Sequence, residues 1–212
     1  MGKVYLLPGL GDDYRIFEGI DLQGHEGVNV EWIVPGKQDT LAAYAQKLID
    51  AYHITSESIV LGNSLGGMIG VEIAKKLGCK TIIISSIKTF DENSGKSKIQ
   101  RLIPFYYPIR SKLAVLVKFF IMPFRGERSK RKQRLFASMK SHTPPSFFKW
   151  AEYAILHWDN QTVPANIYHI NGDHDSVFPS KRIRDAIMVK GGTHTIILDR
   201  KEEINALLKE ML

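Results

Sequence analysis

The sequence has few of the features that would point away from an ordinary globular protein. Its 212 residues include one cysteine, Cys79, so an internal disulfide is excluded and a reducing compartment is indicated. No apolar run approaches the roughly 20 residues that a membrane span needs, because the apolar stretch 113–122 contains Lys118 and is followed by Pro123. The first residues are interrupted by Pro8 and do not resemble a signal peptide. We therefore expect a cytoplasmic protein.

Acidic residues are scarce in one segment of the chain. Between Lys88 and Trp150 there are 15 lysines and arginines but only 3 acidic residues, a local charge of +12, whereas the rest of the chain carries −5. The same segment contains five prolines, and its apolar residues follow helical rather than strand spacing. We predict three or four short helices over residues 88–158, inserted between two parts of a core formed by residues 1–87 and 159–212.

Outside this segment, short apolar runs that end near glycine or proline alternate with helical patterns. The runs predicted as strands are 3–7, 28–34, 58–61, 80–85, 165–170 and 186–190. The predicted helices are 41–52 after N-cap candidates Asp39 and Thr40, 65–77 before Gly78, and 201–212. The stretch 195–198 fits either a short strand or the approach to the last helix. This alternation predicts an α/β fold, with a mainly parallel sheet of about six strands flanked by helices.

A Gly-x-Ser-x-Gly pentapeptide joins a predicted buried strand to a predicted helix, with Ser64 at its centre. A serine on such a sharp turn has a strained backbone that only small neighbours tolerate, and Gly62 and Gly66 are such neighbours. The helix that begins at Leu65 directs free N–H groups and the positive end of its dipole towards Ser64. Ser64 is therefore a candidate nucleophile, and the Leu65 N–H a candidate donor to its anionic intermediate.

A nucleophilic serine needs a histidine base and a carboxylate that orients the histidine. His194 lies in a glycine-containing loop after the sixth predicted strand, whereas His169 lies within a strand and is expected to be a packed residue. In the loop after the fifth strand, both Asp173 and Asp175 are possible acids. We favour Asp175, because Asp173 is placed to hold the turn by a side-chain-to-backbone hydrogen bond. The Asp-His-Asp run lacks the partner ligands that would indicate a metal site.

The stretch Gly9-Leu10-Gly11 follows the first predicted strand. It lacks the third glycine of a dinucleotide-binding fingerprint and the Lys-Ser/Thr of a P-loop, so no cofactor is expected. Beside the nucleophile, its Leu10 N–H would be a second oxyanion donor. Asp12 and Asp13 are expected to cap the short helix that follows.

Four stretches together resemble the α/β-hydrolase superfamily: Pro8–Gly11, Gly62–Met68, Gly172–Pro179 and Gly191–His194. The order of the candidates along the chain, serine, aspartate, histidine, is the order of that family. The layout resembles small bacterial serine hydrolases with a helical cap. Two departures stand out: Pro8-Gly9 replaces the usual His-Gly, and the chain begins at what would be the third strand, without the usual first hairpin.

The resemblance implies that Ser64, Asp175 and His194 form a catalytic triad and that the Leu10 and Leu65 N–H groups form the oxyanion hole. It also implies that the inserted segment is a helical cap over the site. The expected function is cleavage of a carboxylic ester or thioester of a small-molecule acyl substrate. The alternative is a non-hydrolytic, ligand-binding or receptor-like protein of the same fold.

The basic segment from Arg125 to Arg134 has several interpretations. The simplest is a solvated face of a helix. It would also suit an anionic substrate, such as an acyl-coenzyme A, or peripheral contact with an anionic membrane surface. No nucleic acid is expected, since no recognised nucleic-acid-binding fold accompanies the charge.

Overall fold

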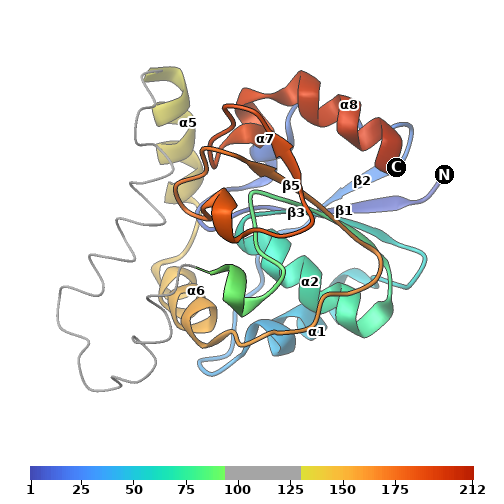
Figure 1. Cartoon of the computed structure of the whole chain (residues 1–212). Helices are drawn as coiled ribbons and strands as arrows, with labels where there is room; N and C mark the ends of the chain where they lie inside the picture. The colour runs from blue at the N-terminus through green and yellow to red at the C-terminus, as the bar shows by residue number, and fades with distance from the viewer. Residues whose placement is uncertain (94–129) are drawn as a thin grey trace.

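The computed structural model describes residues 1–93 and 130–212, and its core is a parallel sheet (Figure 1). The strands are β1 Lys3–Leu7, β2 Glu26–Asn29, β3 Ile59–Asn63, β4 Lys80–Ile84, β5 Ile167–Gly172 and β6 Ile187–Val189. Their order in the described sheet is β2-β1-β3-β4-β5-β6, and every pairing is parallel. The prediction of a mainly parallel sheet of about six strands is confirmed.

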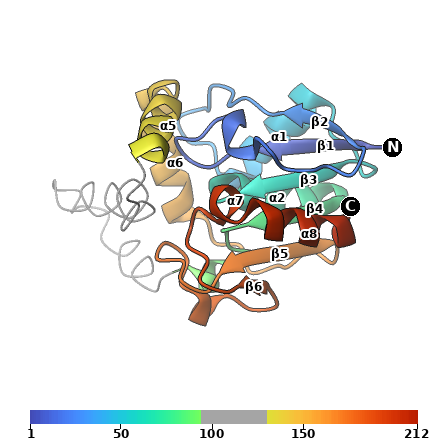
Figure 2. The same ribbon diagram turned by 90° about the horizontal axis from the view of Figure 1, so that it is seen from above.

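Helices cover both faces of this sheet. Below it in Figure 1 lie α1 Leu41–Tyr52, α2 Leu65–Leu77 and α6 Pro145–His157, and above it lie α7 Ile196–Asp199 and α8 Lys201–Met211. Figure 2 shows α5, Lys130–Ser141, and α6 beyond the carboxyl ends of the strands. Three short 3-10 helices complete the described elements: η1 Tyr14–Phe17, η2 Phe90–Glu92 and η5 Ser180–Arg182. No described helix is long and apolar enough to cross a membrane.

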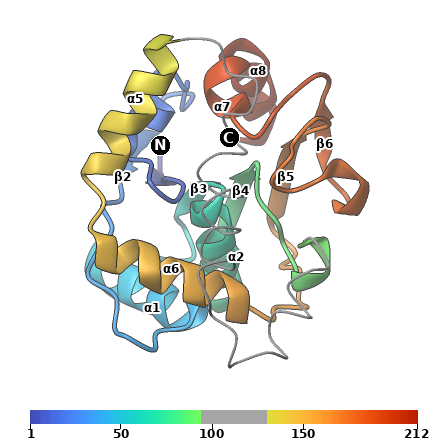
Figure 3. The same cartoon turned by 90° about the vertical axis from the view of Figure 1, so that its left-hand side faces the viewer.

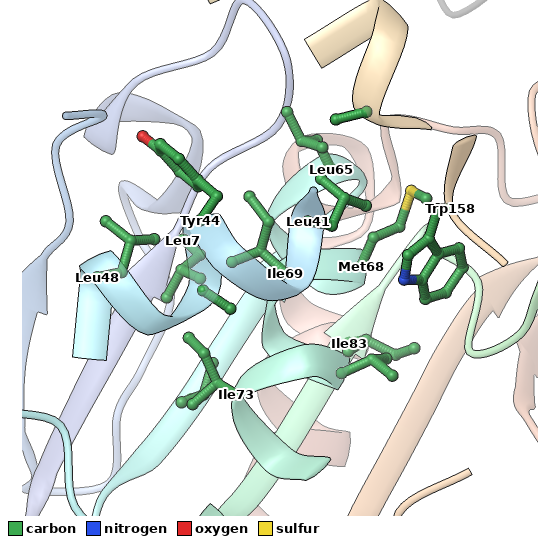
Figure 4. Packing of buried hydrophobic residues seen from close by; sticks show 14 of the residues in the cluster. Leu7, Leu41, Tyr44, Leu48, Leu65, Met68, Ile69, Ile73, Ile83 and Trp158 are labelled. Carbon is green, nitrogen blue, oxygen red and sulfur yellow. The ribbon is translucent and has the colours of Figure 1, made fainter. Parts of the chain in front are cut away.

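Alternation along the strands divides the core into two clusters. In β4, Ile83 packs with α1, α2 and α6, whereas Ile82 and Ile84 pack with the cluster that contains α7 and α8. Figure 4 shows the first cluster, where Ile83 lies beneath Met68 and Trp158. Because both faces of the sheet are buried, its central strands are continuously apolar instead of alternating.

The predicted helices 41–52 and 65–77 are found residue for residue as α1 and α2. The Thr40 side chain caps α1 by accepting a hydrogen bond from the Ala43 N–H at 3.1 Å. Gly78 ends α2 in the left-handed conformation, with φ 67°. The ambiguous stretch 195–198 is helical rather than extended: its last three residues belong to α7, and Thr195 precedes that helix.

The second strand lies earlier in the chain than predicted: β2 is Glu26–Asn29, not 28–34. In the described sheet it is an edge strand that pairs with β1 alone, and the pairing runs from Lys3–Glu26 to Leu6–Asn29. One further bond, from the Val30 N–H to the Leu6 carbonyl, ends the contact. Since β1 stops at Leu7 and Pro8 has no N–H, β1 cannot continue the pairing with the apolar residues after Val30.

Helix α6 is attached to the sheet layer through aromatic side chains. Trp150 is 5% exposed, and its ring centroid lies 4.3 Å from that of Tyr44 and 5.2 Å from that of Phe147. Its indole N–H donates to the Asp39 carbonyl at 2.8 Å, just before α1 begins. The α6 side chains therefore belong to the same apolar cluster as α1 and α2.

We expect Trp150→Ala to lower the free energy of unfolding by about 3–5 kcal/mol, because it removes a buried ring and leaves a cavity. Tyr153→Ala is the matched control, since Tyr153 is on the same helix but 43% exposed. This variant should change the free energy of unfolding by less than about 1 kcal/mol. Urea denaturation of both variants measures the difference. Equal small losses would show that α6 is not anchored through Trp150.

Candidate active site

Ser64 has a backbone conformation that L-residues rarely adopt, with φ 51° and ψ −113°. Its N–H donates to the Ile84 carbonyl at 3.0 Å. Its carbonyl accepts hydrogen bonds from the Gly67 and Met68 N–H groups, at 3.0 and 3.2 Å, and from the Ser86 hydroxyl at 2.6 Å. Bonds from β4, from the loop after β4 and from α2 thus hold the strained residue between β3 and α2.

The two glycines of the pentapeptide make this turn sterically possible. A Cβ at Gly62 would lie 2.4 Å from the Gly66 carbonyl oxygen, and a Cβ at Gly66 would lie 2.1 Å from the Leu7 carbonyl oxygen. Neither distance is tolerated between real atoms, and both partners are backbone. The close approach of β1, β3 and α2 therefore requires glycine at both positions, as the sequence predicted.

The structure brings the three predicted residues together in one hydrogen-bonded row. His194 Nε2 lies 3.1 Å from Ser64 Oγ, and His194 Nδ1 lies 2.8 Å from Asp175 Oδ2. The other carboxylate oxygen of Asp175 accepts from the Val177 and Phe178 N–H groups, at 2.7 and 2.9 Å. Since the three side chains are largely buried, they meet with little competition from water.

Asp173 does not have the turn-holding role that was expected of it. Its Oδ1 is buried with no hydrogen-bond partner among the described residues, and Asp175 instead makes the side-chain-to-backbone bonds of this loop. His169 is buried within β5, and its Nε2 lies 3.1 Å from the Ser86 carbonyl. Burial, together with the nearby Lys88 charge, lowers the pKa of His169 to about 3. His169 is therefore a neutral packed residue.

The row of side chains opens into a cavity of about 270 Å³. The cavity is lined by Leu10, Gly11, Asp12, Ile16, Asn63, Ser64, Gln133, Phe136, Ala137, Lys140, His194, Thr195 and Ile197. Figure 3 looks onto this end of the molecule, with α5 on one side and α7 on the other. A small molecule in the cavity would contact both Ser64 and His194.

The two predicted oxyanion donors belong to the start of α2 and to the loop after β1. Leu65 is the first residue of α2, so its N–H is one of the four without an acceptor inside the helix. Leu10 lines the cavity in the loop after β1. Neither N–H donates to another residue in the described parts of the chain, so both are free to bind an oxygen.

The pair Asp12 and Asp13 divides into two roles. Asp13 caps η1, accepting from the Arg15 N–H at 3.0 Å, and forms an ion pair with the Arg15 side chain at 2.6 Å. Asp12 is not a cap: it lines the cavity, and its Oδ2 lies 3.4 Å from Asn63 Nδ2. Burial raises the pKa of Asp12 to about 7. The expectation that both aspartates cap the helix is therefore wrong for Asp12.

Similar structures place this arrangement in a known fold. No family model and no curated protein matches the chain. An esterase from Exiguobacterium antarcticum superposes with a TM-score of 0.71 at 18% identity, over 99% of this chain and 91% of the esterase. The chain has the α/β-hydrolase fold. A hydrolase from Oleispira antarctica gives 0.73 at 14% identity over 99% and 90% of the two chains, and an esterase from Thermogutta terrifontis gives 0.67 at 13% over 99% and 89%.

In this α/β-hydrolase fold, the sequence did not identify the side chains that α5 contributes to the cavity, namely Gln133, Phe136, Ala137 and Lys140. They belong to the predicted cap, whose residues 94–129 lie outside the described residues, as does the first half of the basic segment 125–134. Which face of α5 meets the cavity depends on packing with distant residues.

The position of Asp12 in the cavity could have been predicted from the sequence, since Asp12 follows a strand end beside the predicted oxyanion donor. No three His, Cys, Asp or Glu side chains of the described residues gather as metal ligands.

We expect Gly66→Ala to destabilise the α/β-hydrolase core by about 3 kcal/mol or more, because the new methyl group overlaps backbone carbonyls that cannot move independently. Gly70→Ala is the matched control on the same helix, since its Cβ would lie 3.3 Å from side-chain methyl groups. Alanine's helical preference, about 1 kcal/mol, offsets that crowding. Chemical denaturation compares the two variants, and equal effects would contradict the steric explanation of the turn.

Proposed function

We propose that the protein is a serine hydrolase that cleaves a carboxylic ester or thioester through an acyl-enzyme on Ser64. The observation that carries the proposal is the row from Ser64 through His194 to Asp175, with contacts of 3.1 and 2.8 Å, at the wall of a cavity that a substrate can enter. The similarity to esterases supports the fold that such a site uses. Because one fold hosts many reactions, the proposal rests on the side chains.

In the first half of the proposed reaction, Ser64 Oγ attacks the acyl carbonyl carbon while His194 Nε2 accepts the hydroxyl proton. The carbonyl oxygen becomes an oxyanion and accepts hydrogen bonds from the Leu10 and Leu65 N–H groups. Asp175 holds the imidazole in place and stabilises its positive charge. The bond to the leaving group then breaks, and the leaving alcohol or thiol takes the proton from His194.

In the second half, a water molecule attacks the acyl-enzyme while His194 accepts its proton. The tetrahedral intermediate forms at the same two N–H groups. When the bond to Ser64 Oγ breaks, the serine recovers its proton from His194 and the carboxylic acid leaves. The cycle consumes one water and needs no metal or cofactor.

Ser64→Ala should abolish covalent labelling by a fluorophosphonate and lower kcat for p-nitrophenyl esters and acyl-coenzyme A thioesters by about 10³-fold or more, because the nucleophile is lost. Ser56→Ala, which removes an exposed serine distant from the cavity, is the matched control and should leave both unchanged. A folded wild-type protein that is never labelled, and binds ligands equally well after Ser64→Ala, would instead indicate the non-hydrolytic alternative.

We further propose that the acyl substrate carries a negative charge distant from its scissile bond. Lys140 lines the same cavity as Ser64, and α5 has several basic residues but no acidic one. A cationic wall raises the local concentration of an anionic substrate and slows its dissociation.

Lys140→Gln should raise KM for an anionic ester several-fold with little change in kcat, and leave KM for a neutral ester of the same acyl chain unchanged. Added salt should reproduce the effect in the wild type, since it screens exposed charges. Lys149→Gln on α6, exposed and outside the cavity, serves as the control. Equal KM changes for both esters would remove the charge argument.

A further inference from the structure

Asp12 lies in the cavity wall with Ser64 and His194, and the mechanism above gives it no part. It belongs to the loop after β1 that also carries Leu10. Its Oδ2 lies 3.4 Å from Nδ2 of Asn63, the residue that precedes Ser64. A second carboxyl group, in addition to Asp175, therefore lines the cavity of the candidate nucleophile and contacts the residue before it.

The surroundings of Asp12 differ from those of Asp13. Asp13 has the Arg15 guanidinium at 2.6 Å, whereas no cation forms an ion pair with Asp12 among the described residues. The nearby cavity wall is apolar at Leu10, Ile16 and Phe136. An ionised carboxylate without a cation is costly in such surroundings, and the neutral acid is favoured.

Two titratable groups act on the pKa of Asp12, and a third charged group lines the same cavity. Asp13 in the same loop raises the pKa of Asp12, and His194, from the loop after β6, lowers it. Lys140 lines the cavity from α5. Burial outweighs these charges, and the resulting pKa of about 7 keeps Asp12 mostly protonated below neutral pH.

A neutral carboxyl group offers a hydrogen-bond donor as well as acceptors. The Asn63 amide already donates to Asp12 Oδ2, so it occupies an acceptor position. The Gly9 backbone also hydrogen-bonds this carboxyl group. The O–H of the neutral acid could then donate to a molecule in the cavity, and an acyl substrate at Ser64 carries oxygens that would accept it.

We propose that Asp12 is a substrate-facing acid that donates a hydrogen bond to an oxygen of the acyl substrate, and that its ionisation closes the site to that substrate. This inference rests on the proposed function. Asp12 keeps its proton throughout, while His194 carries the proton of Ser64. Once ionised, Asp12 would have no hydrogen to donate and would repel the oxyanion that forms at Leu10 and Leu65.

The test is the pH dependence of kcat/KM for a neutral p-nitrophenyl ester between pH 5 and pH 9.5. The wild-type value should fall about tenfold per pH unit above about pH 7, as Asp12 ionises. In Asp12→Asn the amide still donates but cannot ionise, so the alkaline fall should disappear. At pH 9 this variant should exceed the wild type by about tenfold or more.

Two further variants separate the possible causes. Asp12→Ala removes both the charge and the donor, so it should lose the alkaline fall yet remain slower than Asp12→Asn at every pH. Asp13→Asn keeps the cap but removes a neighbouring negative charge. Its alkaline fall should persist and move to lower pH, because the pKa of Asp12 decreases.

A thermal measurement tests the same assignment without turnover. Since the pKa of Asp12 is raised by folding, ionising it penalises the folded state as pH rises from about 4 to about 7. The Tm of Asp12→Asn relative to the wild type should therefore increase over that range and then level off. A difference that stays constant with pH would overturn the assignment.

The outcomes also distinguish the two proposals. Activity that survives Ser64→Ala overturns the proposed function and this assignment with it. Ser64-dependent activity with the same alkaline fall in Asp12→Asn overturns the assignment of Asp12 alone. The assignment of Asp12 is also overturned if Asp12→Asn is less active than the wild type at every pH, because the ionised carboxylate would then be the active form.

Discussion

The backbone of Ser64 is the constraint on which the site depends. Its φ of 51° costs about 1–3 kcal/mol for a residue with a Cβ, and the surrounding bonds must offset that cost. They come from Ile84, Ser86 and the first turn of α2, so β3, β4 and α2 must all be in register for the turn to exist. Gly62 and Gly66 remove the side chains that would prevent this approach. The orientation of the Ser64 hydroxyl therefore depends directly on the packing of the core.

The parallel sheet explains how residues far apart in the chain meet around Ser64. Every strand ends at the same edge, so the loops after β1, β3, β5 and β6 converge there. Ser64 and His194 are 130 positions apart, yet their side chains lie 3.1 Å from each other. Asp175 joins the row because its loop is fixed by its own carboxylate, which binds two backbone N–H groups. Position at a strand end thus matters more than proximity in the sequence.

The features that were predicted correctly from the sequence are those determined by neighbouring residues in the chain. α1 and α2 were predicted to the residue because a capping Thr40 and a terminating Gly78 mark their ends. β2 was misplaced because its extent is decided by its partner, which stops before Pro8, and not by its own apolar residues. Ser64, Asp175 and His194 each follow a strand, so a topological rule was sufficient to group them. The wall formed by α5 follows no such rule, because the rotation of that helix is set by its packing in the second cluster, through Phe136 and Met139.

The same apolar wall links the two charged features of the cavity. Phe136 and Ile197 give the space beside Ser64 an apolar wall, and apolar surroundings strengthen any hydrogen bond that a backbone N–H gives to a developing oxyanion. Burial also penalises the ionised form of Asp12, which has no cation partner in the described chain to compensate. A polar wall would solvate Asp12 and weaken the oxyanion site together. The raised pKa of Asp12 and an effective oxyanion site therefore have a common physical origin. A substitution that makes this wall polar should lower the pKa of Asp12 and weaken the oxyanion site.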